Sequence, residues 1–254
     1  MNPEGIIHEV QVGSRLHGVI VEGTDDDDRM GTYVPTPRRV LGLGEAKTHV
    51  YRDGGAHSKL GKDDKDYVWY PIQKYVSLVV KGNPSVLQTL YAPPHQQFVL
   101  SRWGDALMAG LATFGVSQQA APRYLGYLTS QRHGLLGTRS PSVKRPELVR
   151  AYGYDTKFAF HAIRLGYQGV EFLTHGKITF PMVEQDRNYL LDVRTANGVS
   201  LDNVIEAIDY QREKLRKFVD GEEKSPLPLE PNYVVADQML IDIQVDYWES
   251  NNLL

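Results

Sequence analysis

The stretch GSRLHGVIVEGTDDDDRMG, residues 13–31, places a Gly-Ser pair a few residues before four consecutive aspartates. It follows IIHEVQV, a short and mostly β-branched run that stops at Gly13, which predicts a strand leading into a tight turn. After Gly18, the segments VIV and RMGTYVP frame the aspartates, so the acidic run is predicted to lie on or beside a second strand that ends at Pro35. We expect these two strands to be neighbours in one sheet.

The patterns that follow change from strand to helix. Residues 44–64 are Gly-rich, polar and aperiodic, which predicts a mobile loop. The run DYVWY predicts another strand, and Pro71 precedes apolar residues at helical spacing up to KGNP. Beyond residue 84 the chain reads as almost entirely helical, with Ser200 as the expected N-cap of one helix. The helical patterns cover residues 85–90, 105–114, 123–130, 154–173, 200–218 and 234–248.

These patterns predict an α+β protein: a small N-terminal unit with a mixed sheet over residues 1–92, followed by a mainly helical domain over residues 93–254. With 254 residues, of which 41% are hydrophobic, the chain can bury one large core or two smaller cores. No apolar run approaches the roughly 20 residues that span a bilayer. The N-terminus has no basic or long apolar leader, and together with the absence of cysteine this predicts a cytoplasmic protein without membrane partners.

The four aspartates have two readings. In an extended strand Asp26 and Asp28 point to one face, and Asp25 and Asp27 point to the other. Two carboxylates on one face can hold a divalent cation, and hard oxygen ligands favour Mg²⁺ or Mn²⁺. The alternative is a solvated acidic turn. An EF-hand is excluded because the twelfth position counted from Asp26 is Pro37 instead of Glu.

The Gly-Ser pair favours the cation reading, because a turn at a strand end can present backbone N–H groups and a hydroxyl to phosphate oxygens. Gly-Ser, a spacer and then Asp-x-Asp resembles the signature of the polymerase-beta-like nucleotidyltransferase superfamily. With the blocks GSRLHG, DDDDRMGTYVP, DYVWYPIQKYVSLVVKGNPSVLQTLY and YDTKFAFHAIRLGYQGVEFLTHGKITFP, the chain is similar to the RNA-repair-pathway DNA polymerase beta family, which has many phage-encoded members.

The resemblance implies a set of site residues. Gly13, Ser14 and Arg15 are expected to contact the nucleotide. The family usually reads Ser-Asp-x-Asp, whereas this chain permits two pairs, and spacing back from Met30-Gly31 favours Asp26 and Asp28 as catalytic metal ligands over Asp25 and Asp27. A third carboxylate on a neighbouring strand is expected at Asp66, with Asp63 and Asp64 as competitors.

The helical domain is expected to supply cations. Lys157, His161 and Arg164 fall on one helix face and are predicted to contact the nucleotide; the alternative is an ordinary solvated face. The net charge of the chain is −3, so any basic surface must be local. Residues 117–170 contain eight lysines and arginines against two carboxylates, and within them Lys144 and Arg145 are predicted to bind an RNA acceptor.

The resemblance implies an enzyme, a nucleotidyltransferase with two Mg²⁺ or Mn²⁺ ions, that transfers a nucleoside monophosphate from an NTP to an acceptor hydroxyl, with RNA such as a tRNA end expected as the acceptor. If the chain is phage-encoded, its place is the host cytoplasm. The alternatives are nucleotidylation of a protein or small molecule, and a catalytically silent module that binds nucleotide or RNA. The scattered histidines show no zinc-ligand spacing.

Overall fold

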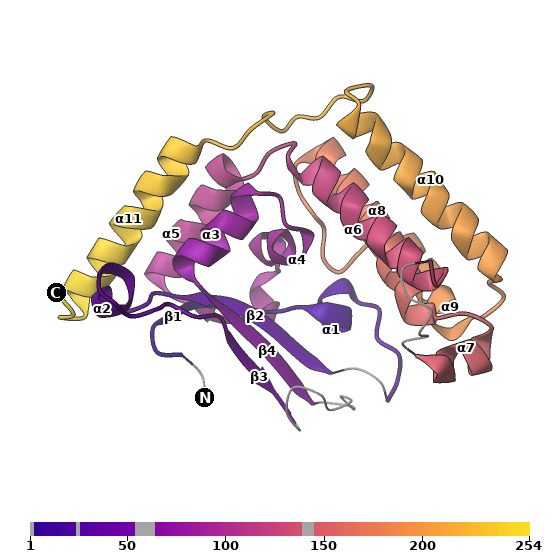
Figure 1. Ribbon diagram of the computed structural model, residues 1–254, viewed down its shortest axis with the longest axis horizontal. Helices are drawn as coiled ribbons and strands as arrows, with labels where there is room; N and C mark the ends of the chain where they lie inside the picture. Colours follow the sequence, from indigo (N-terminus) through magenta and orange to yellow (C-terminus); the bar gives the residue numbers. More distant parts are fainter. Residues whose placement is uncertain (1–2, 24–25, 54–63, 139–144) are drawn as a thin grey trace. The chain divides into compact units, whose positions relative to one another are not determined.

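A computed structural model of the chain describes residues 3–23, 26–53, 64–138 and 145–254 (Figure 1). The chain folds into two compact units. Unit 1 contains Met1–Ser117 together with Glu230–Leu254, and unit 2 contains Gln118–Leu229.

Unit 1 is built on one five-stranded mixed sheet in the order β3-β4-β2-β1-β5. Strands β2 and β4 are parallel, and the other neighbouring pairs are antiparallel. The strands are β1 (Ile6–Gln11), β2 (Asp27–Tyr33), β3 (His49–Arg52), β4 (Lys65–Pro71) and β5 (Gln97–Leu100). The predicted strands around IIHEVQV, the aspartates and DYVWY are confirmed, and the first two of them pair directly.

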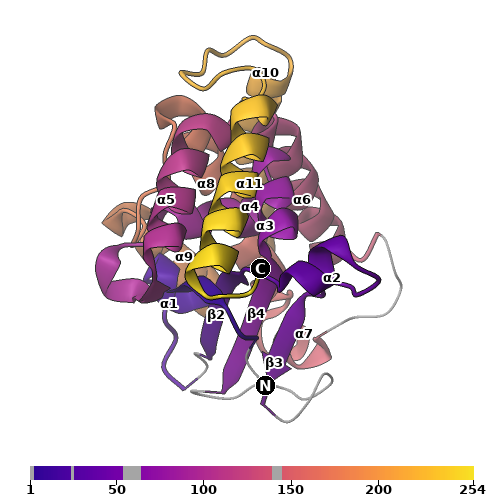
Figure 2. The ribbon, with the colours of Figure 1, turned by 90° about the vertical axis from the view of Figure 1, so that its left-hand side faces the viewer.

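Helices α3 (Ile72–Val80), α5 (Arg102–Gly110) and α11 (Tyr233–Ser250) lie on the same side of this sheet in both views (Figures 1 and 2). α3 starts directly after β4, and its apolar residues at helical spacing are buried, as the sequence predicts. α5 continues into a π-helical turn, Leu111–Gly115. The shorter helices of the unit are α1 (Gly13–His17), α2 (Pro37–Leu41) and α4 (Pro84–Leu87), with 3₁₀ turns at Gln88–Tyr91 and Pro94–Gln96.

The last helix belongs to unit 1 although it lies far along the chain. Trp248 on α11 is buried and donates from Nε1 to the carbonyl oxygen of Pro35 at 2.8 Å. β5 pairs with β1 and so also belongs to this unit. Unit 1 therefore includes segments that lie beyond the predicted domain boundary at residue 92. The assignment of residues 1–92 as a catalytic unit stays a prediction.

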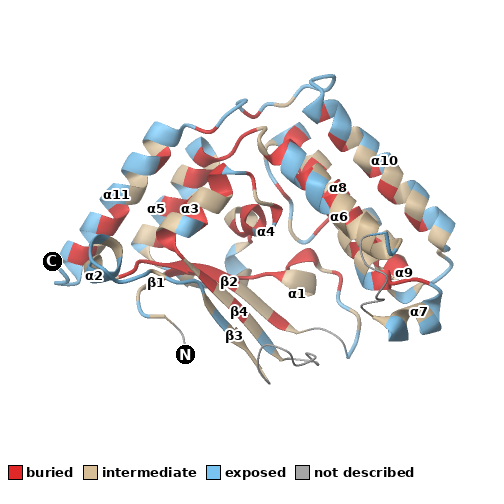
Figure 3. Cartoon of the chain, viewed as in Figure 1, coloured by how far each residue is buried: buried red, intermediate tan, exposed pale blue. Residues whose placement is uncertain are grey.

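Unit 2 is entirely helical in its described residues. Its helices are α6 (Ala120–Leu135), α7 (Pro146–Tyr152), α8 (Thr156–His175), α9 (Glu184–Thr195) and α10 (Leu201–Val219). Ser200 caps α10 as predicted and forms a capping box with Asn203. α10 buries one face and exposes the other (Figure 3), since Val204, Ile208 and Leu215 recur at helical spacing.

Several elements differ from the sequence expectations. Strand β3 lies inside the stretch 44–64, for which the sequence predicts a loop, because His49–Arg52 pairs with β4; residues 54–63 of that stretch lie outside the described residues. The Gly-Ser turn is a short helix, α1, and β5 interrupts the region expected to be helical. The sequence patterns do not predict helix α9, since it is mostly polar and buries only Leu190 and Val193 among its described residues. In the described part of the chain, no helix has the length and apolar character needed to cross a membrane.

Candidate active site

The Gly-Ser turn meets the acidic strand at Asp28. The backbone N–H of Val12 donates to the carbonyl oxygen of Asp28 at 2.9 Å, and Nε2 of Gln11 donates to the same oxygen at 2.7 Å. Gly13 adopts a φ of +70°, and a Cβ atom at this position would overlap Oδ2 of Asp28. Only glycine therefore allows the turn to follow β1 and still leave room for the Asp28 carboxylate.

Asp28 and Asp66 are partners in the parallel ladder of β2 and β4, so they occupy neighbouring positions on one face of the sheet. Asp66 forms an ion pair with Arg52 of β3, with 2.9 Å between Nη2 and Oδ2. The structure thus brings together Gly13, Asp28 and Asp66. Asp26 lies one residue before β2 and is half-buried.

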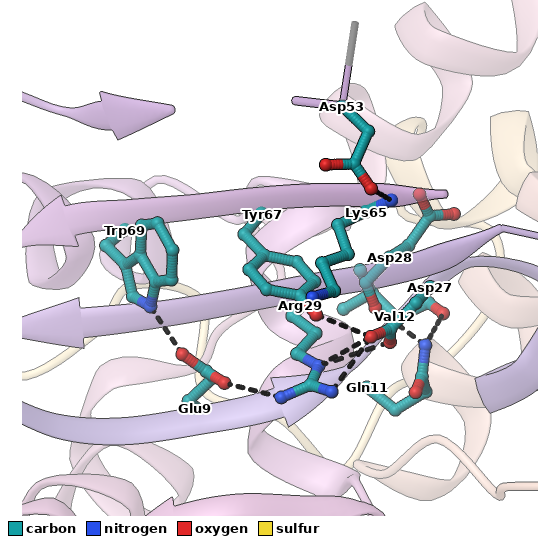
Figure 4. A network of polar contacts seen from close by, with 10 residues as sticks. All are labelled: Glu9, Gln11, Val12, Asp27, Asp28, Arg29, Asp53, Lys65, Tyr67 and Trp69. Carbon is teal, nitrogen blue, oxygen red and sulfur yellow. Dashed lines mark hydrogen bonds and ion pairs between the residues drawn. The ribbon is translucent and has the colours of Figure 1, made fainter. Parts of the chain in front are cut away.

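Asp27 has a different environment, on the opposite face of β2 (Figure 4). Its carboxylate accepts hydrogen bonds from Nε and Nη2 of Arg29 at 3.1 and 2.8 Å and from the Tyr67 hydroxyl at 2.6 Å. Burial favours a higher pKa for Asp27, but the hydrogen bonds of Arg29 and Tyr67 and the charges of Arg29 and Arg15 outweigh it, so the pKa lies below its usual value. Asp27 is therefore an ionised carboxylate that is held by Arg29 and Tyr67.

Arg29 is the centre of this network, which the sequence patterns do not reveal. Its guanidinium also contacts Glu9 at 3.2 Å and lies 3.6 Å from the centre of the Phe98 ring. Glu9 in turn accepts from Nε1 of Trp69 at 2.6 Å. Alternation along β2 puts Asp27 and Arg29 on one face, but the partners come from β1, β4 and β5, which local sequence does not place together.

The residues near the turn have the chemistry that a divalent ion requires, though not as a complete cluster. Asp28 and Asp66 offer hard oxygen ligands on neighbouring strands, and the Asp28 carboxylate occupies the space that a side chain at residue 13 would fill. Among the described residues, no three His, Asp or Glu side chains form a group that would hold a metal ion. Asp25 and Asp63, both named from the sequence as alternatives, lie outside the described residues.

Ser14 and Arg15 follow Gly13 in α1. The backbone carbonyl of Ser14 accepts from the N–H of Val19 at 3.0 Å. The carbonyl of Arg15 accepts from Gln96, and the Arg15 charge acts on Asp27.

In unit 2, a group of cations surrounds His161. Burial lowers the pKa of His161 well below its usual value, and the charges of Arg164, Arg145, Arg194 and Lys157 lower it further. The predicted stripe of Lys157, His161 and Arg164 thus joins Arg145 and Arg194 in what we call the basic cluster, in which His161 is neutral at pH 7. Lys144 lies outside the described residues.

The members of the basic cluster are held by different contacts. Arg145 pairs with Asp155 at 3.0 Å, and Arg164 donates to Oε1 of Gln168 at 2.6 Å. Burial lowers the pKa of Arg164 to about 10, and its Nε has no hydrogen-bond partner among the described residues. Arg194 lies over the Phe160 ring. It was missed from the sequence because it lies on α9, which only folding brings to α8. Such a cluster can bind a multiply charged anion.

The fold and the site together define an α+β protein with a glycine turn beside strand carboxylates on a mixed sheet. The chain belongs to the RNA repair pathway DNA polymerase beta family, whose sequence profile matches residues 2–220, and thereby to the polymerase-beta-like nucleotidyltransferase superfamily. This confirms the family resemblance seen in the sequence.

Two individual proteins are also similar. An Enterobacteria phage T4 protein, described as an uncharacterized 38.9 kDa protein in the nrdC-mobD intergenic region, is 28% identical over 138 residues. That match covers 52% of this chain but 40% of the phage protein, so the chain matches less than half of that relative's length. A crystal structure of a nucleotidyltransferase-like protein from Exiguobacterium sibiricum matches 96% of this chain and 75% of its own, with 11% identity and a TM-score of 0.32.

Proposed function

We propose that this protein transfers a nucleoside monophosphate from an NTP to a hydroxyl group of RNA, such as a tRNA end. The observation that carries the proposal is the contact of Gly13 with the Asp28 carboxylate, with Asp66 beside it in the parallel ladder. Membership of the RNA repair pathway DNA polymerase beta family supports both the transfer chemistry and the acceptor class.

In the proposed reaction, the acceptor hydroxyl attacks the α-phosphorus of the NTP in line with the leaving group. A new P–O bond forms, the bond between the α- and β-phosphates breaks, and pyrophosphate leaves. We assign the hydroxyl proton to Asp66, and the contacts with phosphate oxygens to the Gly13–Ser14 turn and Arg15. A bound Mg²⁺ or Mn²⁺, with Asp26, Asp28 and Asp66 as its proposed ligands, would neutralise charge on the phosphates.

The environment of Asp27 supports Asp26 and Asp28 as the functional pair. Asp27 already accepts hydrogen bonds from Arg29 and Tyr67, and removing it from this network would leave Arg29 without a major partner. Asp28 makes its close approach to Gly13 instead.

We assign the basic cluster of unit 2 to phosphate binding: Lys157, His161 and Arg164 for the nucleotide, and Arg145 with Lys144 for the RNA backbone. Lys157 is exposed, and Arg164 has an Nε without a partner among the described residues. Neutral His161 can donate one ring N–H to a phosphate oxygen and would gain a proton as negative charge approaches.

The test is incubation of the full chain with labelled NTPs, Mg²⁺ or Mn²⁺, and total RNA. We expect label on RNA, and a loss of about a hundredfold or more in Asp28→Asn and in Asp66→Asn, because each substitution removes a charge that acts at the transition state. Asp237→Asn is the matched control, since Asp237 is exposed on α11 and outside the site.

The possible outcomes separate the alternatives. Label on a protein or a small molecule instead of RNA would show that RNA is not the acceptor, while the proposed nucleotidyl transfer would still hold. Saturable NTP binding without any transfer would show a silent binding module. Asp27→Asn is expected to lower stability while the folded fraction retains transfer; loss of transfer in Asp27→Asn with normal activity in Asp28→Asn would move the functional pair to Asp25 and Asp27.

A further inference from the structure

Two adjoining cavities form a groove in unit 2, with walls from α9 and α10 and from Tyr167 of α8. Their volumes are about 560 and about 510 Å³, which is the size range of sites for small molecules. They share Tyr189, Ala207 and Tyr210. We call this the tyrosine groove; it has no residue in common with the basic cluster.

The charges that line the tyrosine groove are negative. Asp186, Asp192 and Glu206 contribute to its walls, and no lysine, arginine or histidine is among the described residues that line the two cavities. Asp186 and Glu206 form no ion pair with any described residue. Burial and the neighbouring Glu171 raise the pKa of Asp186, and burial and Glu206 raise the pKa of Tyr189. No cationic side chain among the described lining residues balances these carboxylates, and a bound cation would stabilise their ionised form.

The aromatic rings of the groove suit the same kind of ligand. Tyr167, Tyr189 and Tyr210 all line it, and tyrosine faces attract ammonium groups. The chain itself contains such a contact: Nζ of Lys214, which lines neither cavity, lies 4.6 Å from the centre of the Tyr210 ring.

A polar side chain that lines the groove has no hydrogen-bond partner among the described residues. Gln211, a residue that is only 6% exposed, lines the wall, and its amide makes no hydrogen bond with a described residue. Its position is fixed by close packing on Gly166 of α8, where a Cβ atom would overlap that of Gln211. The Gln211 amide oxygen is therefore an acceptor for a ligand that donates a hydrogen bond in the groove.

We propose that the tyrosine groove binds an alkylammonium group, with its charge near Asp186 and Glu206, its alkyl part on the tyrosine rings, and a hydrogen bond donated to Gln211. A free aliphatic diamine and the side chain of a lysine both carry this chemistry. Nucleotide phosphates do not, since the groove would repel them.

The test is a calorimetric or chemical-shift titration of the full chain with hexamethylenediamine, and separately with a lysine peptide blocked at both ends. We expect saturable binding of hexamethylenediamine and none of hexanediol, which has the same length without charge. Stronger binding of the peptide would identify the source as a lysine side chain. Asp186→Asn and Glu206→Gln should each weaken binding about fivefold, and Tyr189→Ala by a similar factor.

Glu213→Gln is the matched control, because Glu213 lies on α10, is exposed, and does not line either cavity. If Glu213→Gln weakened amine binding as much as Asp186→Asn and Glu206→Gln do, the loss would reflect the general negative charge of the protein, and the proposal would be overturned. So would an absence of saturable binding of either amine, or tighter binding of adenosine than of hexamethylenediamine. None of these readouts depends on nucleotide transfer, so the groove and the proposed function can fail separately.

Discussion

At the scale of single residues, two features require glycine at position 13: the backbone adopts a positive φ, and the Asp28 carboxylate occupies the space of a side chain. Gly13→Ala is expected to lower the free energy of unfolding by about 1 to 2 kcal/mol for the left-handed backbone, and by about 1 kcal/mol more for the overlap with Asp28. Urea unfolding measures the change. Gly23→Ala is the control, because Gly23 has a φ of +77° and no atom within 4 Å of an added Cβ. Equal losses in the two variants would show that Asp28 moves aside freely.

His8 is a second residue whose surroundings determine its behaviour. It is fully buried beside the Tyr75 ring, neither ring nitrogen has a hydrogen-bond partner among the described residues, and burial lowers its pKa to about 4. Between pH 6.5 and pH 4 the unfolded chain therefore binds a proton that the folded chain does not, and stability falls as the pH falls, by up to about 3 kcal/mol.

The measurement for His8 is urea unfolding at several pH values across this window. His8→Leu is expected to remove the decline and to raise the free energy of unfolding at pH 7 by about 1 kcal/mol, since an unsatisfied polar group is lost. An unchanged decline in His8→Leu would assign it to other groups. The contribution of Asp27 can be distinguished from that of His8. Because the pKa of Asp27 is lowered, protonation of Asp27 reduces the stability of the protein only at lower pH.

At the scale of elements, α8 packs closely against its neighbours through glycine. A Cβ atom at Gly169 would lie 2.7 Å from Cγ of Tyr124 on α6 and 2.9 Å from Cδ2 of Leu215 on α10. We expect Gly169→Ala to destabilise unit 2 by about 1 to 3 kcal/mol, because neither a ring nor a buried leucine can move away easily.

Gly126 on α6 provides the opposite case, since an added Cβ would meet nothing within 4 Å. Gly126→Ala should stabilise the protein by about 1 kcal/mol through helix propensity alone. Thermal or urea unfolding of the two variants gives the comparison. A stabilised Gly169→Ala would mean that α8 can move away from α6 and α10 without loss.

At the scale of the whole molecule, unit 1 is assembled from the two ends of the chain. α11 contributes buried Ala236, Ile243 and Trp248, and Nε2 of Gln73 donates to Oε1 of Gln244 at 2.5 Å. Removing residues 230–254 should cost unit 1 about 3 kcal/mol or more, because a buried tryptophan and its apolar contacts are lost. Hydrogen exchange should show weaker protection of amides in β1 and β2, while α8 and α10 keep theirs. Equal loss in both units would contradict this division.

The sequence predicted the parts of the fold that have strong local patterns. β1, the start of α3 and the Ser200 cap of α10 all follow from residues close together in the chain. β3 and β5 were missed because four residues give too short a pattern, and their pairing with β4 and β1 is what makes them strands. α9 was missed because it is mostly polar and offers few apolar residues, of which Leu190 and Val193 are buried.

The sequence by itself determined the family and the alternation that divides the aspartates into two pairs, since these depend on residue order and the two-residue period of a strand. Only the tertiary structure decided which groups each aspartate meets: Arg29 and Tyr67 for Asp27, Gly13 and Asp66 for Asp28. It likewise brought Arg194 to the basic cluster and three tyrosines to one groove. The reason is physical: charge, burial and hydrogen bonding act through space, between elements whose register and packing are set only when the chain folds.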